Sequence, residues 1–185
     1  MSKYQRLIPI AFVLLLAAAG CGSPSEGPHV HESLTAVDAQ FKIRAYMSEV
    51  LAELPAGAAL SKKPDNPDLA TTKHRRPLPN PCWEGNVQSS GPRYLSIGYW
   101  ITGLPAGSTA EYFERIPAIW QNKGWATETN DVSDVAKAKI PDGFGLQLQD
   151  AGKGDGSLSL TGFSPCLPES TIDAMEDDPF TIPHP

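Results

Sequence analysis

Apolar residues recur at three- and four-residue steps in two segments, the spacing that places them on one face of an α-helix. The first segment, residues 33–54, begins with a capping box at Thr35 and Asp38 and ends before Pro55. The residues that recur at this spacing are Val37, Phe41, Ala45, Ser48 and Leu51. Met47, Val50 and Leu54 widen the apolar face that they form. The second segment ends at Gly124, and its apolar face comprises Tyr112, Phe113, Ile116, Ile119 and Trp120. We expect the apolar faces of both helices to pack on the main domain. The alternative for the first helix is that its apolar face binds in a groove of a partner protein.

Strict alternation of apolar and polar residues, typical of a half-buried strand, marks three further segments. Residues 93–104 alternate first, residues 144–149 follow, and residues 157–163 alternate again after a glycine-rich turn. A further strand begins at Trp125 and runs to about Asn130. A strand, a helix, a strand and a hairpin in this order predict an α+β fold. We expect a small antiparallel or mixed sheet of about four strands covered by two helices.

Two segments lie outside this pattern. Residues 55–81 hold six prolines and a group of basic residues, Lys62, Lys63, Lys73, His74, Arg75 and Arg76. Proline interrupts helices and inner strands, so the segment is predicted to be a solvated linker. The alternative is a contact for anionic envelope polymer or lipid. Residues 169–185 are acidic and are predicted to form a disordered tail.

The beginning of the chain has the layout of an export signal. A short basic segment precedes an apolar run, residues 7–19, which is shorter than the ~20 residues that span a bilayer. The run ends in Ala18-Ala19-Gly20-Cys21, which resembles the bacterial lipobox. The resemblance implies that residues 1–20 are a lipoprotein signal peptide and that Cys21 receives a diacylglycerol. The alternative is an ordinary secretory signal with a chance cysteine.

The location that follows from this signal is the outer face of the plasma membrane. Residues 21–32, rich in Gly, Ser and Pro, would form a tether between the lipid and the domain. The formal net charge of −6 makes the chain a poor partner for nucleic acid or anionic headgroups. We therefore expect the acylated Cys21, and not a basic surface, to hold the protein at the membrane.

The two other cysteines are predicted to form a disulfide. Cys82 and Cys166 lie 84 residues apart and would close a folded core, residues 82–168. A reactive thiol or a metal pair is the alternative. Zinc needs four ligands, and the sequence has no second closely spaced cysteine pair.

Catalytic chemistry has little support in the sequence. The glycine-rich loop 150–156 fits neither a phosphate loop, an EF-hand nor a dinucleotide fingerprint, and is predicted to be a hairpin turn. All four histidines lie outside the predicted core, at His29, His31, His74 and His184. The core therefore lacks the commonest general base. We expect no enzyme, no catalytic residues, no cofactor and no metal.

Aromatic residues offer the remaining candidate site. Tyr99, Trp100, Trp120 and Trp125 could line a ligand pocket. Aromatic side chains are also common in hydrophobic cores, so core packing is the competing interpretation.

Taken together, these features resemble the LppA-like group of mycobacterial envelope lipoproteins. The resemblance is carried by Pro81-Cys82-Trp83, Trp120, Gly124-Trp125, Gly143-Phe144 and Leu160–Pro168. It implies a small actinobacterial lipoprotein facing outward from the membrane, without an assigned activity. The leading hypothesis is a non-enzymatic binding or interaction module for an envelope lipid, polymer or protein. The alternative is a carrier or sensor of a small apolar ligand, such as an envelope lipid, between the helices and the sheet.

Overall fold

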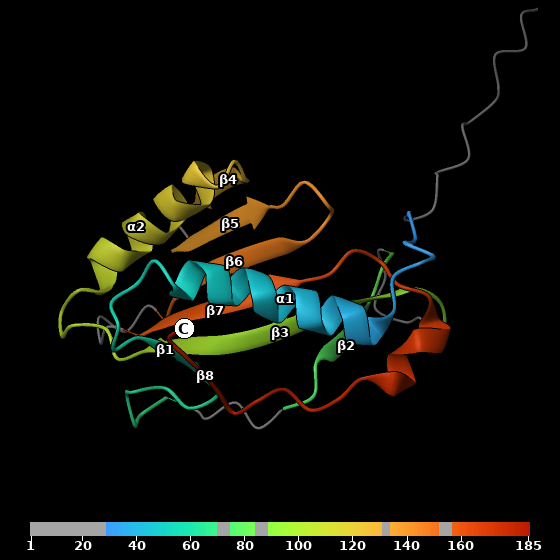
Figure 1. Ribbon diagram of the computed structural model, residues 1–185, viewed down its shortest axis with the longest axis horizontal. Coiled ribbons are helices and arrows are strands. Elements are labelled where there is room, and N and C mark those ends of the chain that lie inside the picture. The colour runs from blue at the N-terminus through green and yellow to red at the C-terminus, as the bar shows by residue number, and fades with distance from the viewer. Residues whose placement is uncertain (1–28, 70–74, 84–88, 131–133, 152–156) are drawn as a thin grey trace, which may run out of the picture.

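The computed structural model describes residues 29–69, 75–83, 89–130, 134–151 and 157–185. The lipid-attachment prediction at Cys21 and most of the predicted tether lie outside these ranges. Within them the chain forms two layers, with helices on one face of a single antiparallel sheet (Figure 1). The helices are α1 (Ala36–Leu51), α2 (Thr109–Asn122) and the short 3-10 helix η1 (Glu169–Ala174). In the described part of the chain, no helix has the length and apolarity needed to cross a bilayer.

The sheet has eight strands in the described ranges, with the order β4-β5-β6-β7-β3-β1-β8 and with β2 also paired to β3. The first four are β1 (Ala59–Ser61), β2 (Leu78–Pro81), β3 (Arg93–Thr102) and β4 (Ala126–Asn130). The others are β5 (Val135–Lys139), β6 (Gly145–Asp150), β7 (Leu158–Phe163) and β8 (Thr181–Pro183). The predicted α+β class is confirmed, and the sheet is antiparallel throughout. The expected number of about four strands was too low, because β1, β2, β5 and β8 were not predicted; of these, β5 lies inside the sheet, between β4 and β6.

The segment predicted to be a linker contributes two of those strands. Its residues 59–61 form β1 and its residues 78–81 form β2, both paired with β3. Pro79 and Pro81 fit here because β2 has a paired strand on one side only. The prediction of a solvated linker was therefore wrong for both of these stretches.

The predicted disordered tail is also ordered. Its first residues form η1 beside α1, and Thr181–Pro183 form β8 against β1. Between them, Met175 and Asp178 are buried. The acidic composition suggested a solvated segment, but Asp178 is held in the interior by cationic partners described below.

The buried face of α1 agrees with the predicted one at Met47, Val50 and Leu51 and differs from it nearer the beginning of the helix. Phe41 and Val37, expected in the core, are 69% and 38% exposed. The buried positions are Ala36, Ala39, Gln40, Ile43, Met47, Val50 and Leu51. The helix crosses β7 at Gly162, where a Cβ atom would lie 2.4 Å from Ile43 Cγ2. The missing side chain at Gly162 lets Ile43 approach the sheet, and this contact is one of those that hold this side of the helix inward.

The second helix follows its prediction more closely. Tyr112, Ile116 and Trp120 are buried, and the helix continues through Pro117. Helix α2 connects β3 to β4. In the sheet these two strands are separated by β5, β6 and β7. The helix thus crosses over the sheet on the same face as α1 (Figure 1).

The predicted disulfide between Cys82 and Cys166 is confirmed, with the Cα atoms 5.9 Å apart. Cys82 directly follows β2, and Cys166 lies shortly after β7. His31, near the beginning of the described residues, contacts the same region, because its backbone N–H donates to the carbonyl of Cys166 at 2.8 Å. The disulfide and this hydrogen bond together join three segments at one end of the sheet.

Candidate functional site

The sheet has one face beneath the helices and one face turned away from them. In β3, the buried residues Leu95, Ile97, Tyr99 and Ile101 alternate with half-buried ones. Strand register extends this alternation across the sheet, since successive side chains point to opposite faces. We call the face away from the helices the open face. Its side chains on the central strands are half-buried or exposed: Tyr94, Ser96, Gly98, Trp100, Ser159, Thr161, Phe163, Gln147, Gln149, Lys137 and Glu128.

One row of register partners crosses the open face from β3 to β4. Gly98 pairs with Thr161, Thr161 with Gln147, Gln147 with Lys137, and Lys137 with Glu128. The row begins with a position that has no side chain and continues through a hydroxyl and an amide. It ends in two side chains of opposite charge, so the row as a whole is neutral.

A hollow of about 190 Å³ lies at the Gly98 end of this row. Strand β2 pairs with β3 as far as Ser96, and β1 pairs with it from Trp100, so a gap remains beside Ile97–Tyr99. A Cβ on Gly98 would lie 3.3 Å from Thr161 Oγ1 and would begin to fill the space. The residues around the hollow are Lys62, Arg76, Leu78, Ser96, Ile97, Gly98, Thr161 and Asp178.

A buried ion pair closes the gap in the sheet. Lys62 Nζ donates to the carbonyl of Gly98 at 2.9 Å, in the position where a neighbouring strand would otherwise pair. The same nitrogen lies 3.5 Å from Asp178 Oδ2 and 3.9 Å from the centre of the Tyr99 ring. Burial lowers the pKa of Lys62 below its ordinary value, although the Asp178 carboxylate opposes this shift.

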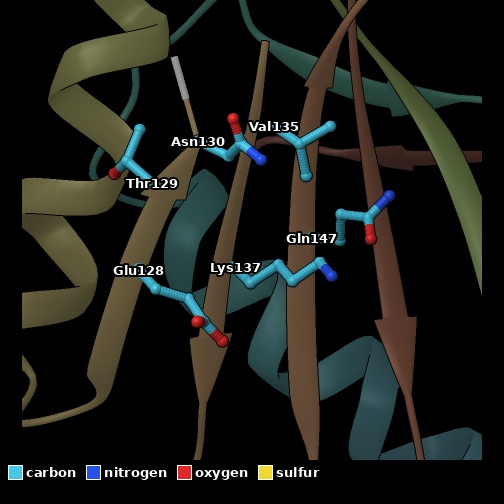
Figure 2. Close-up of a pocket in the computed structure, with 6 residues that line it drawn as sticks. All are labelled: Glu128, Thr129, Asn130, Val135, Lys137 and Gln147. Atoms are coloured by element: carbon cyan, nitrogen blue, oxygen red, sulfur yellow. The ribbon is translucent and has the colours of Figure 1, made fainter. Parts of the chain in front are cut away.

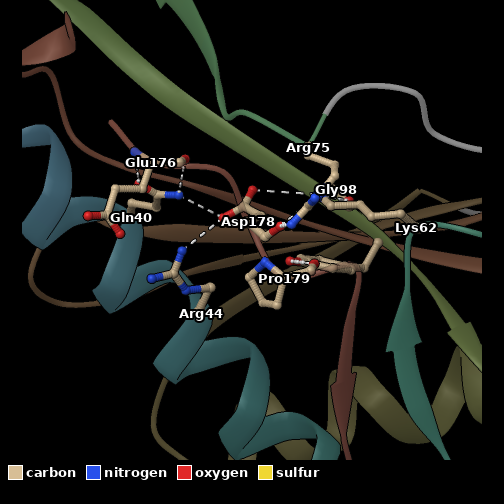
Figure 3. A network of polar contacts seen from close by, with 9 residues as sticks. Gln40, Arg44, Lys62, Arg75, Gly98, Glu176, Asp178 and Pro179 are labelled. Carbon is tan, nitrogen blue, oxygen red and sulfur yellow. Dashed lines mark hydrogen bonds and ion pairs between the residues drawn. The ribbon is translucent and has the colours of Figure 1, made fainter. Parts of the chain in front are cut away.

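Further donors hold Asp178 from the side of α1 (Figure 3). Arg44 Nη1 and Gln40 Nε2 each donate to Asp178 Oδ1 at 2.9 Å. Arg75 donates to the main-chain carbonyl of Asp178, and Arg76 to the carbonyls of Asp173 and Met175. Three basic residues of the predicted linker are therefore occupied with the C-terminal segment. The expectation that they face solvent or an anionic polymer does not hold for Lys62, which is 2% exposed.

A second hollow, of about 270 Å³, lies at the other end of the open face (Figure 2). Its lining residues come from β4, β5 and β6: Glu128, Thr129, Asn130, Val135, Lys137 and Gln147. Gln147 is the register partner of Thr161, which lines the first hollow. The two hollows thus lie on one line across the strands.

The four aromatic residues predicted to line a pocket do not come together. Tyr99, Trp120 and Trp125 are buried in the core, with Trp120 completely excluded from solvent. Tyr99 Oη donates to the carbonyl of Pro179 at 2.9 Å, and the Trp125 ring meets Tyr46 edge-on. Trp100 alone points to the open face, because it alternates with Tyr99.

The open face has two further aromatic residues, of which Phe163 was not among the candidates from the sequence. The rings of Tyr94 and Phe163 lie with centroids 6.3 Å apart on the open face. Phe163 lies two residues beyond Thr161 on β7, and Trp100 lies two residues beyond Gly98 on β3. Because β3 and β7 are antiparallel, these two aromatic residues lie on opposite sides of the Gly98–Thr161 pair. The first hollow therefore has an aromatic residue on either side. Gly98 inside a strand pattern was the available signal, since an isolated strand glycine often marks a close approach.

Within the described ranges, no group of three or more His, Cys, Asp or Glu residues is arranged so that it could hold a metal ion. Comparison of the chain with protein-family models, with curated proteins and with solved structures gave no match. The functional interpretation therefore depends on the geometry of the open face.

Proposed function

We propose that this protein is a lipid-anchored envelope module that binds its ligand on the open face of the sheet and is not an enzyme. In this proposal, the acylated Cys21 holds it on the outer face of the plasma membrane. The observation that carries the proposal is a solvent-facing sheet surface with two hollows and three aromatic residues. An antiparallel sheet can leave one face to water, and the aromatic rings on this face provide apolar surface that a ligand could cover.

The packing beneath the helices favours surface binding over carriage of a small apolar ligand. Large side chains fill the space between α1, α2 and the sheet, and those with less than 2% exposure include Trp120, Tyr99, Ile43, Met47, Leu146 and Leu148. A carrier would need an enclosed apolar cavity of several hundred Å³ there. The two hollows described above instead lie on the open face.

The anchor and the open face can be tested with the same protein. The variant Cys21→Ser is expected to move from the membrane fraction to the soluble fraction. Incubated with isolated cell envelopes, this soluble variant is expected to sediment with them through its open face. Adding Thr161→Arg places a long charged side chain between the hollows and is expected to abolish sedimentation.

The matched control for this experiment is Phe41→Arg, which makes a similar change on the exposed side of α1. It is expected to leave sedimentation unchanged, and circular dichroism would confirm that both variants are folded. Equal sedimentation of the Thr161→Arg and Phe41→Arg variants would contradict binding through the open face. Retention of the Cys21→Ser variant in membranes after a high-salt wash would contradict the lipid anchor.

A further inference from the structure

We propose that the ligand of the open face is a neutral glycan chain that lies across strands β3, β7, β6 and β5 and places one sugar ring at the Gly98 hollow. This inference rests on the proposed function and specifies the chemistry of its ligand. Three features carry it: the line of the two hollows, the uncharged hydrogen-bonding side chains between them, and the aromatic residues beside the first hollow.

The line of hollows fits an extended polymer. The row from Gly98 to Glu128 crosses five strands, which at a strand spacing of about 4.8 Å corresponds to roughly 19 Å. A single small molecule would occupy one hollow only. A chain of several sugar rings can reach from the Gly98 hollow to the one at Lys137.

The polar groups of the open face fit hydroxyls. The hydroxyls of Thr161, Ser159 and Ser96 can each donate and accept, and the amides of Gln147 and Gln149 offer both functions on separate atoms. Sugar hydroxyls have the same dual character. A peptide strand is less well matched, because its donors and acceptors are satisfied at a sheet edge and not on a sheet face.

The charges of the open face favour a neutral ligand. Lys137 and Glu128 are register partners of opposite sign, and Glu128 also lies 3.7 Å from Lys139. At the first hollow, Lys62 is paired with Asp178. Oδ2 of Asp178 receives no hydrogen bond within the described structure and is completely buried. The charged groups around this hollow already have partners within the protein: Lys62 and Arg44 pair with Asp178, and Arg76 donates to the carbonyls of Asp173 and Met175. An uncharged sugar ring could occupy the hollow without breaking these contacts.

The aromatic residues supply the apolar part of sugar recognition. Sugar rings have C–H faces that stack on aromatic rings, and Trp and Tyr combine an apolar body with a polar tip. Trp100 stands on one side of the Gly98 hollow, and Phe163 with Tyr94 stands on the other. A sugar ring seated at the hollow would therefore have an aromatic side chain on each side of it.

Titration calorimetry of the mature Cys21→Ser protein with two neutral hexasaccharides, chitohexaose and cellohexaose, tests the proposal. Binding of at least one is expected. Trp100→Ala is expected to weaken it about tenfold, the loss typical of removing one stacked aromatic ring. Gly98→Val is expected to weaken it at least as strongly, because it fills the hollow with a residue that strands accept readily.

Phe41→Ala is the matched control, since it removes an exposed ring from α1, and its affinity is expected to equal that of the unsubstituted chain. Thermal unfolding would show that Trp100→Ala and Gly98→Val are folded. The proposal is overturned if neither hexasaccharide binds, if a sulfated hexasaccharide binds more tightly than both, or if Phe41→Ala weakens binding as much as Trp100→Ala. Should Thr161→Arg still abolish sedimentation with envelopes, the open face would remain the binding surface and only the glycan assignment would fail.

Discussion

Lys62 and Asp178 form an ion pair in the interior, with Nζ and Oδ2 3.5 Å apart and with 2% and 0% of their side chains exposed. The two residues come from segments that lie outside the alternating pattern of the sequence. Their pairing attaches the C-terminal segment to the gap in the sheet, directly behind the Gly98 hollow. The shape of the proposed binding surface therefore depends on this pair.

Loss of the Asp178 charge is expected to destabilise the fold strongly. Asp178→Asn leaves the buried Lys62 without its counter-ion and weakens the bond from Arg44. Breaking a buried pair from one side typically costs about 3–5 kcal/mol, so we expect a loss near 3 kcal/mol in the free energy of unfolding. Urea denaturation followed by fluorescence would measure it. Asp177→Asn, at the exposed neighbouring position, is expected to change stability by less than about 0.5 kcal/mol.

A double variant separates the buried charge from the packing. Replacing both partners, as Lys62→Met with Asp178→Leu, removes the unpaired charge and is expected to recover part of the stability lost in Asp178→Asn. Equal stability of Asp178→Asn and the unsubstituted protein would show that the pair does not hold the C-terminal segment in place.

The disulfide is expected to contribute several kcal/mol. It closes a loop of 84 residues, for which the chain-entropy model gives about 4.5 kcal/mol. Cys82→Ser combined with Cys166→Ser is therefore expected to lower the free energy of unfolding by about this amount in urea. The same shift is expected when the unsubstituted protein is reduced. A midpoint that does not move on reduction would contradict this expectation.

Because of Asp142, the free energy of unfolding is expected to depend on pH in the acid range. Burial would raise the pKa of Asp142, but hydrogen bonds from Lys42 and Tyr46 of α1 outweigh this effect and hold the pKa below its ordinary value. A carboxylate with a lowered pKa stabilises the fold above its unfolded pKa of about 4, and this contribution is lost as the pH falls through the folded pKa.

The comparison that tests this is Asp142→Asn against the unsubstituted chain. Asp142→Asn is expected to be less stable at pH 7, and the difference should shrink below about pH 4. Urea midpoints at several pH values would follow it. Glu114→Gln, on the exposed side of α2, is the control and should show no such convergence. A difference that stays constant down to pH 2.5 would contradict the assignment.

Gly162 is expected to tolerate no side chain. A Cβ there would lie 2.4 Å from Ile43 Cγ2, so Gly162→Ala should cost about 1–3 kcal/mol through overpacking. Ile43→Ala makes room, and the double variant is expected to cost less than the sum of the two single variants. Gly98→Ala is the matched control, because its Cβ would meet only Thr161 Oγ1 at 3.3 Å. Additive losses in Gly162→Ala and Ile43→Ala would argue against their contact.

The sequence predicts β3, β6 and β7 because their alternation is local and long, and it predicts the disulfide because Cys82 and Cys166 remain once Cys21 is assigned to lipid. Strands β3, β6 and β7 each extend over six or more alternating residues. By contrast, β1 and β8 have three residues each and form through pairing with distant segments, β1 with β3 and β8 with β1. A three-residue segment carries too little periodicity to be recognised.

The errors at α1 and in the tail have a common cause in tertiary contacts. Phe41 appears apolar enough for the core, yet Gln40 is buried in its place because its amide reaches the carbonyl of Glu176 and the carboxylate of Asp178. Partners more than 130 positions away decide which face of the helix turns inward. The helical pattern of a single segment cannot show which of its faces such distant partners bury. The hollow at Gly98 likewise depends on contacts between segments that are distant in sequence.

The most direct test of the central claim uses the anchored protein in living cells. A photo-crosslinking p-benzoylphenylalanine is placed at Gln147 on the open face or at Phe41 on the opposite side of the molecule, with Cys21 intact. The account predicts crosslinked envelope material from position 147 and little or none from position 41. Crosslinking that is equal at both positions, stronger at 41 or absent at 147 would contradict the claim that the open face binds the ligand.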